Sequence, residues 1–324
     1  MKNTIFNIQS TEDFNKTALQ VFKHQFTNNK VYRSFCDLIY VHPSDVNTIE
    51  QIPFLPIQFF KTREVLSSTD EIQEVFASSG TTGSTTSKHL VTDLSWYETS
   101  YLKGFEYFYG NIEDYIVLAL LPNYLERKGS SLIYMVDDLI KRSKNSESGF
   151  YLNNLEELAE KLTHLDKQNK KVLLIGVSFA LLDLIEQYKF NLSNTIIMET
   201  GGMKGRRKEL IRNELHTLLC NGFGVDTIHS EYGMTELLGQ GYSKGNGVFN
   251  CPPWMQILTR DTEDALTILP KGKSGGINVI DLANYNSCSF IATQDLGKIH
   301  QDNSFEIIGR FDNSDIRGCN LMVL

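Results

Sequence analysis

The sequence predicts an α/β fold with largely parallel sheets covered by helices, followed by an all-β subregion. Before residue 242, short apolar stretches such as 115–121 and 171–177 alternate with helical patterns, which is typical of a parallel sheet. After residue 242, short apolar stretches are joined by turns rich in Gly, Pro and Asn. We therefore expect an α/β core over residues 1–242 and a β-rich subregion with a short C-terminal tail over 243–324.

The elements are predicted in order along the chain. A helix is expected at 13–27, where apolar residues follow a helical period. Pro53 and Pro56 predict an extended segment over 52–60 that ends in a short turn of helix. The remaining strands are expected at 74–77, 89–92, 115–121, 171–177, 195–199, 225–228, 254–259, 276–281, 289–293 and 305–308, and the remaining helices at 94–109, 130–141, 153–167, 179–188 and 204–219.

The helix at 94–109 is rich in aromatic residues and should begin after Asp93, a good N-cap residue. Its aromatic side chains could line an acyl or aryl pocket. Core packing is the more common use of such side chains, and we expect it here.

Composition and charge exclude several classes of function. Asp and Glu number 39 against 31 Lys and Arg, which gives a formal net charge of -8. The sequence contains no basic run, so we expect no binding to nucleic acid. The N-terminus lacks the apolar segment of a signal peptide, and the longest apolar stretch, 172–185, is too short and too interrupted to span a membrane. We expect a cytoplasmic protein without a membrane span.

Cysteines are present at positions 36, 220, 251, 288 and 319 and form no CxxC pair. An odd number in a chain without a signal peptide argues against a disulfide framework or a zinc site. We expect them to be reduced, and most of them to be core residues.

The segment 77–89 combines glycines, many hydroxyl side chains and one lysine. Gly80 and Gly83 allow backbone conformations that direct several N–H groups at one anion, and Lys88 adds a positive charge. The segment does not fit the Walker pattern, because Ser87 stands where that pattern needs a glycine. A flexible linker is the alternative, but the strands expected on both sides favour a phosphate-binding loop.

Three further polar segments follow predicted strands, where ligands of parallel sheets bind. Residues 200–206 place glycines before a helix and could bind an anion or a nucleobase, or form an ordinary turn. In 231–236, Thr235 and Glu236 could contact a phosphate and Mg²⁺, although a solvated loop is the simpler interpretation of this segment alone. Asp295 could bind ribose hydroxyls or form a turn.

The order of these segments carries more information than any one of them. SSGTTGSTTSKH, GGMKGR, YGMTE, TQDLG and GRFDNSDIRG follow one another as the signature motifs of adenylate-forming enzymes do. The resemblance extends from about residue 50 to the end of the sequence. IPFLPIQFFK, LPNYLERKGSSLIYM and the ending RGCNLMVL more specifically resemble the acyl-protein synthetases of the LuxE type. The resemblance implies the N-terminal domain fold of an adenylate-forming enzyme.

The resemblance also implies cofactors and residue roles. ATP and Mg²⁺ would be bound, and a carboxylate would attack the α phosphorus to give an acyl adenylate and pyrophosphate. Lys88 and Thr235 would take part in this step, Thr235 through the α phosphate, and Glu236 would ligate Mg²⁺. The implied nucleotide-binding residues are Ser79, Gly80, Thr81, Thr82, Gly83 and Lys88 for the phosphates, Gly201, Gly202 and Tyr232 for adenine, and Asp295 and Arg310 for ribose.

The sequence departs from the wider superfamily after Arg310. Those enzymes continue into a mobile lid that supplies a catalytic lysine, and this sequence ends at Leu324. Either another cation substitutes for that lysine (Lys88, Lys204, Arg206 or Arg127), or a partner subunit completes the site, or adenylation is slow. The acyl-protein synthetases resemble this chain in lacking the lid.

In that family the acyl group passes from AMP to a cysteine near the C-terminus, and Cys319 is at the matching position. The resemblance therefore implies an ATP-dependent ligase that activates a carboxylic acid, in particular a fatty acid, and transfers it to Cys319 for delivery to a reductase. One alternative is an acyl-CoA or carrier-protein ligase of the phenylacetate ligase type. Another is an inactive nucleotide-binding scaffold.

Overall fold

The structure, a computed structural model, describes residues 1–78, 86–121, 129–152, 154–201 and 210–311. Its helices are α1 (Lys2–Ile5), α2 (Thr11–Asn28), α3 (Lys30–Leu38), α4 (Phe59–Thr62), α5 (Leu94–Tyr109), α6 (Ser131–Arg142), α7 (Leu155–Lys167), α8 (Ser178–Gln187) and α9 (Arg212–Phe223), with short 3-10 helices η1 (Ile49–Gln51), η2 (Ile112–Asp114) and η3 (Leu282–Asn284). Its strands are β1 (Leu55–Pro56), β2 (Glu74–Ala77), β3 (Lys88–Val91), β4 (Ile116–Leu120), β5 (Gly149–Phe150), β6 (Val172–Val177), β7 (Thr195–Thr200), β8 (His229–Tyr232), β9 (Gly241–Ser243), β10 (Val248–Asn250), β11 (Met255–Arg260), β12 (Ser274–Asp281), β13 (Phe290–Ile299) and β14 (Phe305–Arg310).

One large sheet runs through the molecule, and its two halves pair differently. β5, β4, β6, β7 and β8 are neighbours in that order and pair in parallel. From β8 the order continues through β9, β10, β14, β13, β12 and β11, and all of these pairs are antiparallel. The predicted α/β class with C-terminal strands is confirmed. In this sheet the run of parallel neighbours covers β5 to β8, and β1 adds one further parallel pair with β13.

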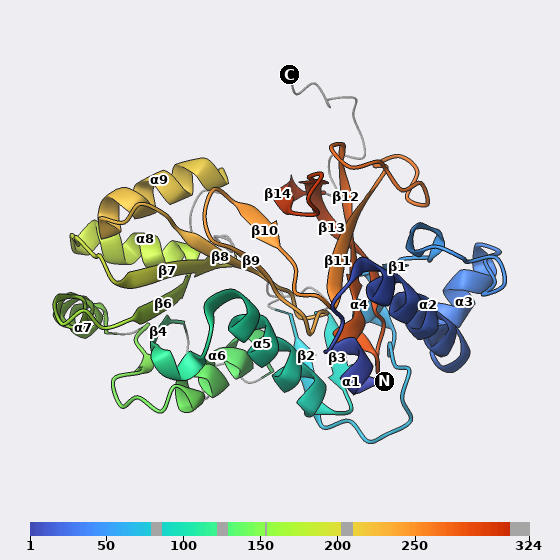
Figure 1. The fold of residues 1–324 in the computed structure, drawn as a ribbon, viewed down its shortest axis with the longest axis horizontal. Coiled ribbons are helices and arrows are strands. Elements are labelled where there is room, and N and C mark those ends of the chain that lie inside the picture. Colours follow the sequence, from blue (N-terminus) through green and yellow to red (C-terminus); the bar gives the residue numbers. More distant parts are fainter. Residues whose placement is uncertain (79–85, 122–128, 153, 202–209, 312–324) are drawn as a thin grey trace.

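Helices cover both faces of the parallel half. In Figure 1, α8 and α9 lie above β6, β7 and β8, whereas α5 and α6 lie below. Every residue of β4 and β6 is buried, as expected for strands covered on both sides. The packing leaves no space for a side chain at Gly176 of β6, because a Cβ there would lie 2.9 Å from Leu181 Cδ2 in α8.

The start and packing of α5 follow the sequence. The Asp93 side chain accepts a hydrogen bond from the backbone N–H of Ser95 at 3.0 Å, which confirms the predicted N-cap. Tyr101 and Phe105 are buried in the core, so the expectation of core packing is confirmed for them. Tyr107, by contrast, is exposed.

Two predicted elements after β7 are wrong in their positions. The strand expected at 225–228 lies instead at His229–Tyr232. Of the helix expected at 204–219, residues 204–209 lie outside the described part of the chain. Within the described part, α9 begins at Arg212 and continues to Phe223, because Ile211 has an extended backbone (φ -64°, ψ 148°) and so cannot belong to the helix. Gly224 ends α9 in the left-handed conformation (φ 69°), and the next residues connect to β8.

Several short elements, among them α1, β5, β9 and β10, were not predicted, and two longer elements were missed in whole or in part. α3 was not expected, and it follows α2 directly because the Asn29 side chain accepts a hydrogen bond from Tyr32 N–H at 2.9 Å and caps the new helix. β13 continues to Ile299, beyond the predicted end at residue 293, because it pairs with β14 over this extension. Asp295 therefore lies within a strand, and the alternative of a turn-forming Asp is wrong.

The part after β9 is built from strands. Among residues 244–311, the structure describes β10 to β14 and a helical turn only at η3. The division at residue 242 stays a prediction, because β9 spans this position and pairs with both β8 and β10. Trp254 Nε1 also donates a hydrogen bond to Ser100 Oγ in α5 at 3.0 Å, so the two parts are in direct contact.

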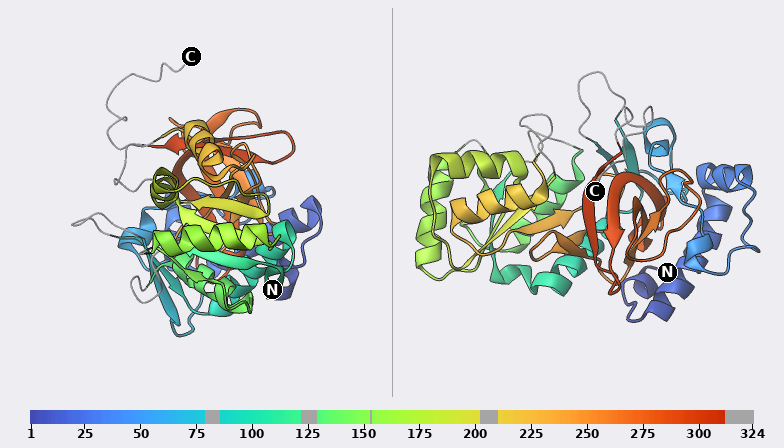
Figure 2. Two further views of the ribbon diagram at one scale, coloured as in Figure 1. Left: turned by 90° about the vertical axis from the view of Figure 1, so that its left-hand side faces the viewer. Right: turned by 90° about the horizontal axis from the view of Figure 1, so that it is seen from above.

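The N-terminal helices lie against the C-terminal strands. Seen from above in Figure 2, β11 to β14 lie between the half that contains α6 to α9 and the helices α1 to α3. Gln25 of α2 is fully buried and donates to the carbonyl of Asn284 at 3.0 Å, and it accepts from Ser289 N–H at 2.9 Å. The start and the end of the described chain therefore share one core.

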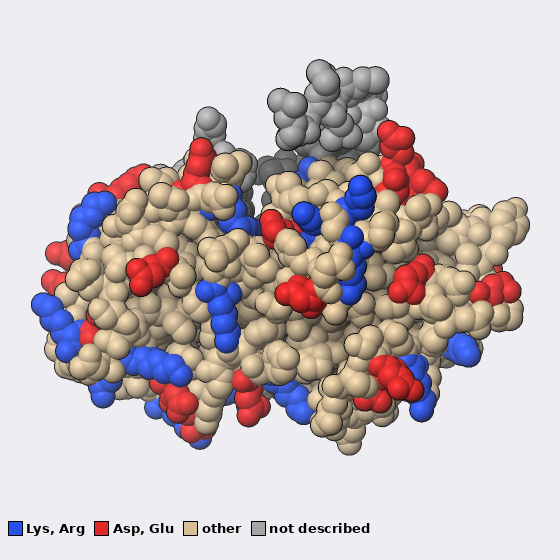
Figure 3. Space-filling view, turned by 45° about the horizontal axis from the view of Figure 1, so that its top comes forward, with Lys and Arg blue, Asp and Glu red and all other residues tan. Residues whose placement is uncertain are grey.

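Two properties of the molecule bear on the expected partners. Among the described helices, none is both long and apolar enough to cross a membrane. On the face shown in Figure 3, Lys and Arg side chains are interspersed with Asp and Glu side chains.

Candidate functional site

Asp295 is the centre of a hydrogen-bonded group that joins three strands. The Tyr232 hydroxyl at the end of β8 donates to Asp295 Oδ2 at 2.8 Å, and Arg310 Nε at the end of β14 donates to Asp295 Oδ1 at 3.0 Å. The register of the sheet explains the second contact, since Asp295 and Arg310 are paired residues of β13 and β14. The structure thus brings together three residues from the YGMTE, TQDLG and GRFD segments.

Burial determines which member of the Tyr232–Asp295 hydrogen bond is the donor. Burial, together with the Asp295 carboxylate, raises the pKa of Tyr232 well above its ordinary value, so the phenol stays protonated and acts as a donor. The Asp295 side chain is 8% exposed, whereas that of Arg310 is 73% exposed. The buried Tyr232 therefore holds the carboxylate from the protein interior, while the exposed Arg310 contacts it from the solvent side.

Glu236 lies beside the base of the segment 77–89. It is 6% exposed, and this burial raises the pKa of its carboxyl group. A hydrogen bond with Ser87 and the positive charges of Arg310 and Lys61 act in the opposite direction. Because Ser87 precedes β3 and Arg310 ends β14, Glu236 connects the phosphate-binding loop predicted from the sequence to the Asp295 group.

Thr235 is held by its backbone. Its carbonyl oxygen lies 3.0 Å from His89 Nδ1, and His89 follows Lys88 in β3. Thr235 is partly buried, and its neighbour Glu236 is buried. Thr235 therefore contacts His89 of β3, and Glu236 contacts Ser87, the residue before β3.

Lys88 is the first residue of β3 and is exposed. Side chains alternate along a strand, so Lys88 points to the opposite face of β3 from His89, the residue that contacts Thr235. The predicted strands around the loop are confirmed, since β2 and β3 are antiparallel neighbours with Ala77 opposite Lys88. The role of Lys88 in phosphate binding stays a prediction.

Several predicted residues lie outside the described part of the chain. These are Ser79, Gly80, Thr81, Thr82, Gly83, Gly202 and Cys319, together with Lys204, Arg206 and Arg127. The base of the loop is described, and there Ser78 N–H donates to the Ser87 carbonyl at 3.0 Å and Ser87 N–H donates to Ser78 Oγ at 2.9 Å.

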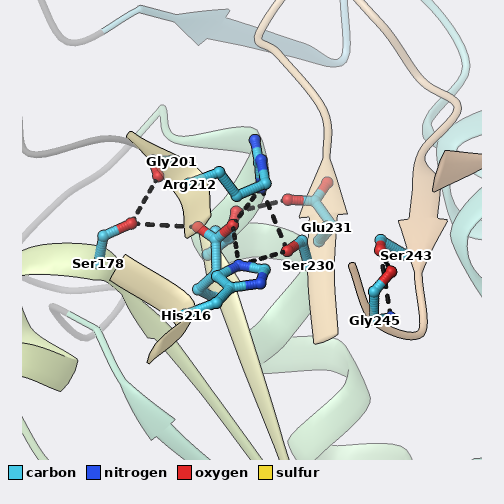
Figure 4. A network of polar contacts seen from close by, with 10 residues as sticks. Ser178, Gly201, Arg212, His216, Ser230, Glu231, Ser243 and Gly245 are labelled. Atoms are coloured by element: carbon cyan, nitrogen blue, oxygen red, sulfur yellow. Dashed lines mark hydrogen bonds and ion pairs between the residues drawn. The ribbon is translucent and has the colours of Figure 1, made fainter. Parts of the chain in front are cut away.

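Gly201, at the end of β7, is anchored by a buried polar network (Figure 4). It has a positive φ of 67°, and its carbonyl accepts a hydrogen bond from Ser178 Oγ at 2.9 Å. Ser178 also reaches Glu199, which is paired with Arg212 and lies 3.6 Å from His216. Burial would raise the pKa of Glu199, but the hydrogen bond with His216 and the charge of Arg212 outweigh it and lower the pKa.

Sequence reasoning missed the residues that support this site. Glu199 and Arg212 fix the Gly201 turn, and Asp281 and Asn284 bind the backbone after Glu236. None of them belongs to a recognisable motif, since each acts through a contact that forms only in the folded chain, between Glu199 and Arg212 and between the 281–284 segment and the backbone of 236–239. The DLAN segment after β12, with its two polar residues beside a strand end, was the one signal that could have indicated the last two.

The carboxyl groups of the site bear on the binding of Mg²⁺. The described residues include no group of three or more His, Cys, Asp or Glu side chains that could hold a metal ion. Mg²⁺ at nucleotide sites usually needs only one or two carboxylates besides the phosphates. Glu236 fits this requirement, because a buried carboxyl group with a raised pKa gains stability from a nearby cation.

Comparison with solved structures defines the class of the fold. The 2-hydroxyisobutyryl-CoA ligase in complex with 2-HIB-AMP matches with a TM-score of 0.68 at 12% identity, over 93% of this chain and 68% of that chain. ATP-bound MatB from Rhodopseudomonas palustris matches with a TM-score of 0.55 at 18% identity, over 75% of this chain and 49%, about half, of that chain. The fold is that of the adenylate-forming enzymes.

Sequence comparison then gives the family. Residues 6–101 and 132–324 match the family described as acyl-protein synthetase, LuxE, and the chain belongs to this family. The long-chain-fatty-acid–luciferin-component ligase of Vibrio harveyi is 24% identical over 93% of this chain and 84% of the relative. The protein of the same name from Aliivibrio fischeri is 25% identical over 94% of this chain and 86% of the relative.

Proposed function

We propose that this protein activates a long-chain fatty acid with ATP and then transfers the acyl group to a thiol, its own Cys319. The observation that carries the proposal is the convergence of Tyr232, Asp295, Arg310 and Glu236 next to the base of the segment 77–89. The family and the names of the relatives support a fatty acid as the substrate.

In the first step, a carboxylate oxygen of the fatty acid attacks the α phosphorus of ATP. The bond from this phosphorus to the oxygen that bridges to the β phosphate breaks, and pyrophosphate leaves. Asp295 and Arg310 bind the ribose hydroxyls, Asp295 as a hydrogen-bond acceptor, and Tyr232 keeps the Asp295 carboxylate in place. The loop 79–88, with its glycines and Lys88, binds the β and γ phosphates. Gly201, Gly202 and Tyr232 border the adenine, and Thr235 contacts the α phosphate.

Positive charge is needed where negative charge grows on the phosphates. Arg310 supplies one charge at the rim of the site. Glu236 would hold Mg²⁺, which when bound neutralises phosphate charge. The burial that raises the pKa of Glu236 suits it to a cation partner.

In the second step, the Cys319 thiolate attacks the acyl carbon, the bond from this carbon to the AMP oxygen breaks, and AMP leaves. The described cysteines are poor candidates for this role, because burial raises the pKa of each thiol, to about 12 for Cys36. The resulting thioester would be the form delivered to a reductase partner, a step supported by the family resemblance alone.

Mass spectrometry tests the proposal. After incubation with ATP, Mg²⁺ and palmitic acid, the peptide that contains Cys319 should carry the acyl mass and lose it in neutral hydroxylamine. Cys319→Ser should abolish the adduct while leaving acid-dependent AMP formation detectable. Cys220→Ser, which changes a partly buried thiol, should retain the adduct.

The alternatives give different results in the same experiment. Acyl-CoA formation without an adduct on the protein would indicate a CoA ligase and contradict the Cys319 step. An absence of both acyl transfer and acid-dependent AMP formation would indicate a nucleotide-binding scaffold and contradict the proposal as a whole.

A further inference from the structure

His89 is a buried histidine with both ring nitrogens engaged. It is 1% exposed, and Phe60 packs against its ring at 5.6 Å between centroids. Nδ1 lies 3.0 Å from the Thr235 carbonyl oxygen, and Nε2 lies 2.8 Å from Ser287 Oγ. Burial lowers the pKa of His89 to about 4, so the ring is neutral at physiological pH.

The partners of the ring determine its tautomer. A backbone carbonyl can only accept a hydrogen bond, so the Nδ1 atom of His89 must carry the proton and donate it to Thr235. The Nε2 atom is then an acceptor, and the Ser287 hydroxyl donates to it. The arrangement satisfies both nitrogens of a neutral imidazole.

His89 completes a set of side chains that hold an irregular turn. Asn284 Nδ2 donates to the Glu236 carbonyl at 2.7 Å, and Asp281 Oδ2 accepts from Gly239 N–H at 2.6 Å. These contacts hold the turn from the side of η3. His89 holds the Thr235 carbonyl from β3, which begins at Lys88, near the end of the segment 77–89.

We propose that His89 is a positioning residue for adenylation. Its Nδ1–H fixes the Thr235 carbonyl and thereby positions Thr235 and the next residue, Glu236, whose carboxyl group hydrogen-bonds with Ser87 just before β3. The inference rests on the proposed function, because the roles of Thr235 and Glu236 belong to that proposal. It adds a role for His89, the last residue of the SSGTTGSTTSKH segment, that the order of motifs does not assign.

Two amide substitutions, His89→Asn and His89→Gln, distinguish the contributions of the two ring nitrogens. The side-chain amide of Asn reaches about as far as Nδ1, so His89→Asn can still donate to the Thr235 carbonyl. The amide of Gln reaches about as far as Nε2, so His89→Gln keeps only the Ser287 side. We expect kcat of fatty-acid-dependent ATP–pyrophosphate exchange to fall by roughly 10- to 100-fold in His89→Gln and by less than about 5-fold in His89→Asn.

The KM for ATP distinguishes positioning from a general loss of structure. Displacement of Thr235 and Glu236 should lower kcat while the KM for ATP changes by less than about 3-fold in His89→Gln, because the Asp295 group is untouched. Ser287→Ala, which leaves the Nδ1 contact in place, should resemble His89→Asn. Equal kcat losses in the Asn and Gln variants would overturn the inference.

A measurement on the unaltered protein covers the case in which the variants do not fold. Nitrogen-15 NMR of labelled histidine should show His89 as the neutral Nδ1–H tautomer, and an Nε2–H tautomer or a protonated ring at neutral pH would overturn the inference. The exchange assay on the wild type tests the proposed function separately. Failure of that assay with the Nδ1–H tautomer present would count against the function and not against the contact.

Discussion

Glu236 has a carboxyl group whose buried environment disfavours the charged form. Its burial raises the pKa, and the opposing contributions come from Ser87, Arg310 and Lys61. A group in such an environment is stabilised by a cation that binds beside it. This is the residue-scale basis for placing Mg²⁺ there.

Replacement of Glu236 by Gln keeps the size of the side chain and removes its charge. We expect acyl-adenylate formation to fall by about 100-fold or more, roughly 3 kcal/mol in the barrier, because the site would lose a metal ligand. The dependence of the rate on Mg²⁺ concentration should also shift to higher concentrations. The measurement is fatty-acid-dependent pyrophosphate release.

The control for this variant is Glu263→Gln, which makes the same change in an exposed turn. It should leave both the rate and the Mg²⁺ dependence unchanged. If Glu236→Gln behaved like this control, the assignment of Glu236 to the metal would be wrong.

Tyr232 acts on Asp295 through one hydrogen bond of 2.8 Å in a buried location. Tyr232→Phe should raise the KM for ATP by roughly 5-fold, about 1 kcal/mol, because Asp295 would lose the donor that orients it. Tyr115→Phe removes another buried hydroxyl, one that donates to the Tyr109 carbonyl far from the site. That variant should lose stability and keep its KM for ATP, and equal KM values in all three proteins would contradict the ribose role of Asp295.

The turn that carries Thr235 and Glu236 is shaped by other elements. Asp281, at the end of β12, accepts hydrogen bonds from the backbone N–H groups of Leu238, Gly239 and Ala283. It is fully buried, and burial raises its pKa from 3.8 to about 6 in spite of these donors. The Asp281 carboxyl group at the end of β12 thus titrates at higher pH in the folded protein than in the unfolded chain.

This difference in pKa predicts a pH dependence of stability. The folded state holds the Asp281 proton more tightly, so its contribution is fully present below about pH 4 and decreases as the pH rises to about 6, by roughly 3 kcal/mol. Asp281→Asn removes this titration. The stability of the wild type relative to the Asn variant, measured by urea unfolding, should therefore fall between pH 4 and 6, and a difference that is constant or rises over this range would show the shift to be absent.

Local pattern located most elements, and the misses have physical causes. α5 was predicted with its correct bounds, because apolar period and the Asp93 cap agree. α9 starts at Arg212, later than predicted, because nothing in the local sequence indicates the extended conformation of Ile211. β13 was predicted too short, because strand length depends on the partner β14, which lies later in the sequence.

For the site, motif order indicated which residues to expect but not what supports them. The contact of Tyr232 with Asp295 and that of Arg310 with Asp295 depend on the register of β13 and β14 and on the position of β8. The supporting roles of His89 and Asn284 could not be predicted from local sequence, since each side chain hydrogen-bonds to the backbone of a turn that is distant in the sequence. Such contacts exist only in the folded chain.

At the scale of the whole molecule, the sheet brings distant parts of the sequence to one place. The parallel half ends at β8, and β9 and β10 separate β8 from β14 and β13 in the sheet. The side chain of Tyr232 in β8 nevertheless reaches Asp295 in β13. β3 reaches the same place through His89, which contacts Thr235 after β8. A chain that folds in this way can assemble one nucleotide site from segments more than two hundred residues apart, as Lys88 and Asp295 are.

The central claim, that this site activates a fatty acid with ATP, is tested most directly by ATP–pyrophosphate exchange. The full chain is incubated with ATP, Mg²⁺ and labelled pyrophosphate, with and without palmitic acid. We predict that label enters ATP when the fatty acid is present, because formation of the acyl adenylate is reversible. Label at the acid-free level in both samples would contradict the account.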